Sequence, residues 1–310
     1  MESMSETNTA LQSLSRDLAC VVEQTGAAVV AIYAQRHLSS SGVCWRDDVI
    51  VTAAHTLRQT EGISVILSSG EAIAGTLAGT DPSTDLAILK INNTKLTIPH
   101  FGDTSQLKVG HVVLAVGRGI RRGLNATMGI VGVLSGAWRT WRGGLIDQFI
   151  GLDLVLRSGA VGGALVDGGG HVLGINTSGL SRGVALTIPV STVDRVVQQL
   201  LEKGHIGRGY LGLGMYAIPL PQELKTALNL SAESGLIVVS VEPQGPGNQA
   251  GVLLGDVVVA VDGKAVSNVR DLQAFLEPES VGKSVPVSLV RSGKPLVVNV
   301  TIGERRQRSD

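Results

Sequence analysis

The sequence predicts a protein dominated by β-structure, with an antiparallel sandwich or barrel in residues 1–206 and a smaller α+β domain in residues 207–310. Three observations support this fold class. Short runs of β-forming residues follow one another without helices between them, which is typical of antiparallel rather than parallel sheets. The 40 glycines and few aromatic residues suit many tight turns. The pattern then changes after Pro189, where a helix and a second set of strands begin.

The first domain is expected to start with one helix and to continue with strands. Residues 1–10 are polar and expected to be loose, whereas apolar residues from Leu14 to Val22 recur at helical spacing. Eleven β-rich runs follow, each bounded by glycine, proline or polar residues. They cover residues 28–34, 49–54, 63–67, 73–78, 86–91, 112–116, 126–134, 148–156, 163–167, 172–177 and 184–188. Ser191 is expected to cap a helix that ends at Gly204.

The second domain is predicted to combine strands with one short helix. Residues 207–209 read as a hinge, and strands are expected over residues 236–241, 257–261, 285–291 and 296–302. The dipeptides Asp262-Gly263 and Ser292-Gly293 are typical of two-residue hairpin turns. Residues 269–275 are expected to form the helix.

Three separated segments carry residues that act together in nucleophilic catalysis. His55 follows an apolar strand, Asp85 precedes another, and a glycine-rich segment spans residues 159–165. In such a site an imidazole takes the proton of a nucleophile, and a carboxylate fixes the imidazole's tautomer. Asp81 is the alternative candidate for the carboxylate, but it lies farther along the chain from the apolar strand at residues 86–91, which would position the side chain. Asp85 is therefore preferred.

The order of these segments resembles the trypsin-like proteases and, most closely, the HtrA/Deg family of PDZ-bearing quality-control proteases. The matching stretches are Thr52–His55, Asp85–Lys90 and Gly159–Leu165. The resemblance covers nearly the whole chain. It implies a trypsin-like double six-stranded β-barrel followed by a PDZ domain. It also implies a homo-oligomer, which is a trimer in the family, and an oxyanion hole made by the N–H groups of Gly159 and Val161.

The residue at the expected nucleophile is a valine. The third segment of the family reads Gly-Asn-Ser-Gly-Gly-Pro-Leu, and aligning residues 162, 163 and 165 with it places Val161 at the serine. Valine has no nucleophilic or ionisable atom, so we expect proteolysis to be negligible. Ser158 and Ser178 are the alternative hydroxyls, but neither position along the chain keeps an oxygen within reach of the imidazole. Ala160 and Ala164 also depart from the family pattern, as expected of a naturally silenced site.

Two further segments resemble the peptide-binding parts of the family. The residues that would receive a peptide carboxylate are Tyr210, Leu211, Gly212 and Leu213. Leu272 and Phe275 are candidates for the adjoining apolar pocket. Residues 174–178 resemble the strand that pairs with substrate in the protease cleft. The expected partners are therefore unfolded polypeptides or protein C-termini.

These features favour a proteolytically inactive HtrA-like protein, a pseudoprotease that binds peptides or unfolded chains. One alternative is an active serine endopeptidase in which residue 161 has been altered or another nucleophile is used. A second alternative is a scaffold that uses the PDZ domain alone.

Composition excludes several other classes. The 26 basic side chains match 26 acidic ones, so no global field favours nucleic acid or an anionic membrane. No apolar run reaches the length of about 18 residues needed for a membrane span. No cofactor or metal motif is present. Cys20 and Cys44 are expected to be free, with a single disulfide as the alternative. Residues 1–6 lack an export signal, which favours a cytoplasmic location, with the removal of a targeting segment as the alternative.

Overall fold

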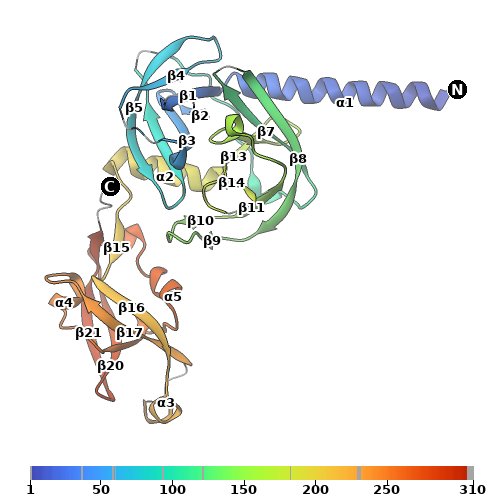
Figure 1. Ribbon diagram of the computed structural model, residues 1–310. Coiled ribbons are helices and arrows are strands. Elements are labelled where there is room, and N and C mark those ends of the chain that lie inside the picture. Colours follow the sequence, from blue (N-terminus) through green and yellow to red (C-terminus); the bar gives the residue numbers. More distant parts are fainter. Residues whose placement is uncertain are drawn as a thin grey trace. The chain divides into compact units, whose positions relative to one another are not determined.

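The computed structural model describes residues 2–35, 38–57, 59, 61–92, 94–120, 122–181, 183–228 and 232–305. The chain divides into two compact units, Met1–His205 and Ile206–Asp310. The first unit contains two closed six-stranded barrels, and the second contains a twisted sheet with short helices (Figure 1). The predicted fold class is confirmed.

The first barrel is closed by antiparallel strands in the order β1-β2-β3-β6-β5-β4. Their bounds are β1 Val29–Gln35, β2 Leu38–Arg46, β3 Val49–Ala53, β4 Ile63–Ile66, β5 Ala72–Asp81 and β6 Leu86–Lys90. Every residue of β3 is buried, because the barrel interior covers one face and the rest of the unit covers the other. The interior is filled by aliphatic side chains that include Ile32, Ile50 and Leu89.

The second barrel has the strand order β11-β14-β13-β12-β7-β8. Its strands are β7 Val112–Gly119, β8 Gly123–Ser135, β11 Phe149–Asp153, β12 Ala164–Val166, β13 Val172–Thr177 and β14 Ala185–Pro189. A separate hairpin, β9 Trp138–Arg139 and β10 Leu145–Ile146, lies between β8 and β11 in the sequence.

Strand β2 was not predicted, because its first half is rich in serine, whereas β-branched and aromatic residues are the usual strand signal. Ser40 and Ser41 are nevertheless buried. With β2 included, the strands predicted for this domain complete both barrels. The hairpin β9–β10 was also missed.

Helix α1 extends over Glu2–Gly26 (Figure 1), so the expectation that residues 1–10 are loose was wrong. Its last turn is attached to the second barrel through Arg118 of β7. Arg118 Nη2 donates to Gly26 O at 2.7 Å, and Arg118 Nε donates to Val29 O at 2.7 Å. A cation at a helix C-terminus satisfies carbonyls that have no partner within the helix.

Helix α2 spans Val190–Lys203 and ends at Gly204, whose φ of 73° is left-handed, as predicted for a C-terminal glycine. The N-cap is Pro189 and makes no side-chain hydrogen bond, so the expected cap by Ser191 was wrong. Among the described residues, no helix combines the length and apolar character required to cross a membrane.

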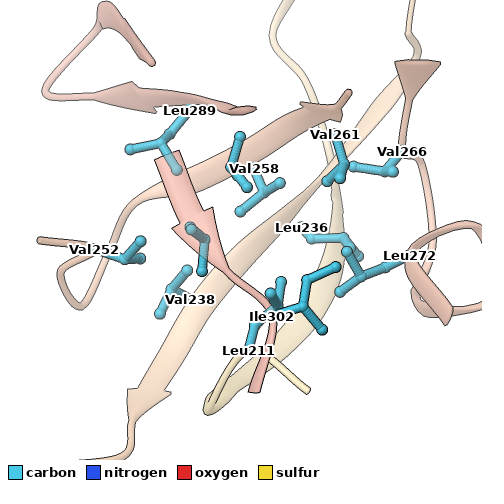
Figure 2. Close-up of a cluster of buried hydrophobic side chains, with 12 residues drawn as sticks. Leu211, Leu236, Val238, Val252, Val258, Val261, Val266, Leu272, Leu289 and Ile302 are labelled. Carbon is cyan, nitrogen blue, oxygen red and sulfur yellow. The ribbon is translucent and has the colours of Figure 1, made fainter. Parts of the chain in front are cut away.

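The second unit is built on a sheet with the strand order β16-β17-β18-β20-β21, with β19 paired to β18. Its strands are β15 Arg208–Tyr210, β16 Leu213–Pro219, β17 Ser234–Val241, β18 Val257–Val261, β19 Lys264–Ala265, β20 Ser284–Arg291, β21 Lys294–Thr301 and β22 Gly303–Arg305. Its helices are α3 Gln222–Leu228, α4 Pro246–Gln249 and α5 Val269–Gln273. Aliphatic side chains from the sheet and α5 form one core (Figure 2).

Local signals in this unit had mixed success. Asp262, Gly263, Ser292 and Gly293 all have positive φ, as two-residue hairpin turns require. The predicted hinge at residues 207–209 was wrong, because residues 208–210 form β15 and pair with β22. The resemblance implied a strand after residues 210–213 but gave no bounds for it; this strand is β16, which forms one edge of the sheet.

Candidate functional site

The structure brings His55 and Asp85 together at one end of the first barrel. His55 lies in a short 3-10 turn directly after β3, and Asp85 directly precedes β6. Because β3 and β6 pair antiparallel with Ala53 opposite Leu86, the two side chains meet. His55 Nδ1 lies 2.7 Å from Asp85 Oδ2, and the His55 backbone N–H donates to Asp85 Oδ1 at 2.8 Å.

Asp85 is buried and held in an unusual backbone conformation. Its φ is 58°, a left-handed value that few non-glycine residues adopt. Its carbonyl accepts a hydrogen bond from Ala54 N at 3.0 Å. Thr177 Oγ1 donates to Asp85 Oδ2, and Gly179 N donates to Thr177 Oγ1 at 2.9 Å. Thr177 was not identified in the sequence, since no local signal links it to a residue so distant.

These contacts fix the state of the imidazole. An ionised carboxylate only accepts hydrogen bonds, so Nδ1 of His55 carries a proton, and in the neutral imidazole Nε2 then has a free lone pair. Among the described residues, only Asp85 hydrogen-bonds to the His55 side chain, which is 38% exposed. The arrangement can accept a proton at Nε2 and stabilise the charge that results.

Asp81 has a different role from Asp85. Its carboxylate accepts from Ser83 N at 3.0 Å, from Ser83 Oγ, and from Thr84 Oγ1 at 2.7 Å. These are contacts within one turn. Asp81 therefore shapes the turn that precedes Asp85, and His55 pairs with Asp85.

The glycine-rich segment forms a sharp elbow between a 3-10 turn, Ser158–Ala160, and β12. Val161 is 6% exposed. Gly162 has a φ of 77°, and a Cβ there would collide with Ser41 O and lie 2.5 Å from Thr52 Oγ1. The elbow therefore requires glycine at residue 162 both for its backbone angle and for space.

Ser41 of β2 holds this elbow from the first barrel. Ser41 N donates to Val161 O at 2.9 Å, and Ser41 Oγ donates to Gly159 O at 2.7 Å. Ser41 Oγ also accepts from Arg118 N at 2.7 Å. The role of Ser41 was not predicted from the sequence, because the serine-rich composition of β2 does not indicate a strand.

The expected oxyanion-hole donors lie on the elbow, with Gly159 inside the 3-10 turn and Val161 directly after it. The side chain of Ser158 lies outside the described residues, and Ser178 is exposed.

Strand β13 cannot receive a peptide in the way expected for residues 174–178. Gly174 and Ile175 pair with β12 on one side and β14 on the other, and Asn176 pairs with β14 and bonds to Gly162 and Gly163. These residues therefore have no free edge. The expectation was wrong for them and stays a prediction for Thr177 and Ser178.

In the second unit, residues 210–213 lead into the edge strand β16. Gly212 has a φ of 68°. Leu211 O accepts from Gly247 N at 2.7 Å, and Gly212 O accepts from Glu242 N at 2.8 Å. In this part of the described chain, the N–H groups of Leu211 and Gly212 donate to no acceptor.

Part of the expected apolar pocket belongs to the core. Leu211 and Leu272 are each 3% exposed and lie among the core side chains in Figure 2. Phe275 is partly buried against the same cluster, and Lys264 Nζ lies 5.9 Å from its ring centroid. Tyr210 is half-buried, and Leu213 packs against the core. That Leu272 and Phe275 line a peptide pocket stays a prediction.

Two domain families match the chain. The trypsin-like peptidase domain matches residues 40–175, and the PDZ domain matches residues 209–302. The barrels with the His–Asp pair and the sheet with the glycine loop thus define a trypsin-like peptidase fold joined to a PDZ domain.

Comparison with solved structures identifies the family of this chain. The chain is 30% identical to a serine endoprotease from Yersinia pestis, with a TM-score of 0.74, covering 92% of this chain and 97% of that one. The HtrA-type protease AlgW with a decapeptide is 28% identical with a TM-score of 0.76, covering 93% and 99%. The chain belongs to the HtrA/DegP family.

The curated relatives are longer than this chain. A probable periplasmic serine endoprotease DegP-like from Brucella suis is 37% identical over 85% of this chain and 52% of its own length. The periplasmic pH-dependent serine endoprotease DegQ of Escherichia coli is 33% identical over 82% of this chain and 56% of its own. The chain therefore spans about half the length of the curated relatives it matches.

The expectation of a cytoplasmic location was wrong. The curated relatives are named periplasmic endoproteases, which points to the periplasm. The expectation depended on the charge and hydropathy of residues 1–6.

Proposed function

We propose that this protein is a proteolytically inactive HtrA-family member that binds peptides or unfolded polypeptides. The proposal is supported by the His55–Asp85 pair together with a glycine-rich elbow whose residue 161 is a valine, which has no hydroxyl. The proposal assigns His55 and Asp85 to two triad positions, Val161 to the third, and Gly159 and Val161 to the oxyanion hole.

The chemistry of residue 161 supports this proposal. Attack on a peptide carbonyl requires an oxygen that His55 can deprotonate, and a saturated side chain cannot supply one. Loss of the serine in proteases of this mechanism lowers turnover by about a million-fold. The two γ-methyl groups of valine are also stiff at χ1, and they occupy space near the reacting atoms.

The second unit supports the peptide-binding part of the proposal. A loop with free N–H groups at Leu211 and Gly212 can receive a C-terminal carboxylate, and the edge strand β16 can pair with the peptide backbone. AlgW, a structural relative, is described with a bound decapeptide. We extend the proposal to a homo-oligomer, in line with the family resemblance.

The test uses the full chain and a fluorophore-labelled unfolded protein. Binding should raise fluorescence anisotropy, and electrophoresis should show an intact client after prolonged incubation. Fragments that appear in a purified, inhibitor-free sample would overturn the inactive assignment. Absence of binding would overturn the peptide-binding assignment.

A matched pair of variants locates the binding. Gly212→Val fills the loop, because a Cβ there would lie 3.2 Å from Gly245 Cα. Gly282→Val carries the same left-handed strain, with a φ of 82°, but it has open space around it. Binding through the loop predicts loss in the first variant and retention in the second. Equal behaviour of the two would place binding elsewhere.

A further inference from the structure

The hairpin β9–β10 contacts the turn that carries Asp85. Its residue Thr140 is 4% exposed and lies between the two short strands. Thr140 Oγ1 donates to Ser83 O at 2.7 Å and accepts from Gly144 N at 3.1 Å. This hydroxyl, together with Arg142 Nη1, which donates to Pro82 O at 3.3 Å, joins the hairpin to a turn that lies far away in the sequence.

The turn is held both from within and from outside. Asp85 adopts a left-handed φ of 58°, and its carbonyl accepts from Ala54 N. Hydrogen bonds from Ser83 and Thr84 to Asp81 set the shape of the turn, and its two ends continue into the paired strands β5 and β6. The Ser83 carbonyl, two residues before Asp85, is where the hairpin holds the turn.

The hairpin is closely packed against this carbonyl. A Cβ on Gly144 would collide with Ser83 O. The hairpin itself is closed by a bond from Thr140 N to Gly144 O at 2.9 Å. Its base is tied to α2, where Arg195 Nη2 donates to Leu145 O at 2.9 Å. Because the hairpin is itself anchored to α2, it can hold the turn in a fixed position.

We propose that Thr140 is a positioning residue for the His55–Asp85 pair. The hydroxyl of Thr140 fixes Ser83, Ser83 fixes the turn, and the turn aims the Asp85 carboxylate at Nδ1 of His55. The inference rests on the proposed role of this pair. Thr140 touches neither substrate nor the reacting atoms, and it acts only through Asp85.

The direct test is the proton NMR signal of His55 Nδ1–H in the full chain. A proton held between an imidazole and a carboxylate resonates far downfield, and its absence in Asp85→Asn and His55→Gln assigns it. Thr140→Val should broaden the signal or shift it upfield, and Thr140→Ser should restore it. Urea unfolding of each variant separates this effect from a general loss of stability.

A second variant covers the case in which Thr140→Val fails to fold. Gly144→Ala keeps the Thr140 hydroxyl but pushes the hairpin against Ser83 O, so it should also displace the signal. An unchanged signal in a folded Thr140→Val or Gly144→Ala protein would overturn the proposal.

An activity readout complements the signal. In a Val161→Ser background, Thr140→Val should slow labelling by a fluorophosphonate about tenfold or more, because misplacement of catalytic groups by about 1 Å has effects of that order. The NMR signal does not depend on cleavage. An active wild-type protein would therefore overturn the proposed function and leave the test of Thr140 intact.

Discussion

Gly179 approaches His55 so closely that a Cβ on residue 179 would lie 2.6 Å from Nδ1 of the imidazole. The same atom would lie 2.7 Å from Asp85 Oδ2. Glycine is thus required at residue 179 for space, although its φ is not left-handed. The His55–Asp85 bond exists only because the chain that passes over it has no side chain.

Gly179→Ala should therefore separate His55 from Asp85. The downfield Nδ1–H signal is expected to disappear while the far-ultraviolet circular dichroism stays unchanged. Gly168→Ala is the control, since that glycine lies in open space and, like Gly179, does not have a positive φ. A Gly179→Ala protein with the wild-type signal would show that the approach is looser than described.

Ser41→Ala should destabilise the first unit more than its neighbour Ser40→Ala. Ser41 Oγ serves both Gly159 O and Arg118 N, whereas Ser40 Oγ accepts one bond from Thr56 Oγ1 at 3.1 Å. Unpaired buried groups cost about 1–3 kcal/mol, and the loss from Ser41 is expected near the top of that range. Equal urea midpoints for the two variants would contradict the assigned role of Ser41.

The pair Asp256–Arg291 should make the second unit sensitive to acid. Arg291 Nε and Nη2 donate to the two oxygens of Asp256 at 2.8 Å, and Asp256 is 1% exposed. Hydrogen bonds from Arg291 lower the pKa of Asp256, with a smaller contribution from Leu253 N. Because the folded pKa is depressed, the stabilisation is complete above the ordinary carboxyl pKa of about 4, and it is lost as pH falls through the folded value.

Calorimetry of the full chain from neutral to acidic pH checks this dependence. Wild type should unfold at a higher temperature than Asp256→Asn at neutral pH, and this difference should disappear as the pH falls below about 4. At neutral pH, Arg291→Met should lower the unfolding temperature, because it removes both side-chain hydrogen bonds to the buried Asp256 carboxylate. A difference in unfolding temperature between wild type and Asp256→Asn that does not change with pH would contradict the linkage.

The two cysteines should differ in reactivity. Both are free, with Cys20 exposed and Cys44 buried, so the predicted free state agrees with the structure. Burial raises the pKa of the Cys44 thiol to about 12, and the thiolate is the reactive form. A thiol reagent should modify one thiol per native chain, and Cys20→Ser should abolish that reaction. Rapid modification of two thiols in the native protein would contradict this assignment.

The sequence was most informative where function is encoded locally. The segments around His55, Asp85 and Val161 were recognisable because a short stretch of apolar or glycine-rich chain surrounds each residue. The first-barrel strands predicted from apolar runs and the second-unit turns at Asp262 and Ser292 were found for the same reason. These signals need no knowledge of the rest of the fold.

Contacts between distant segments could not be predicted. Ser41, Thr140 and Thr177 are ordinary polar residues in the sequence, and each acquires its role from a partner in a remote segment. Residues 174–176 were likewise expected to offer a free strand edge, but they lie within the closed second barrel and have none. Both kinds of fact depend on how the strands are arranged, which alternating hydrophobicity does not specify.

The central claim is that the elbow at residue 161 lacks a nucleophile while its surroundings are assembled for one. Labelling with an activity-based fluorophosphonate tests it most directly, with wild type, Val161→Ser and Val161→Ser/His55→Ala compared side by side. The account predicts no labelling of wild type, labelling of Val161→Ser, and loss of that labelling in the double variant. Labelling of the wild-type protein that His55→Ala abolishes would contradict it.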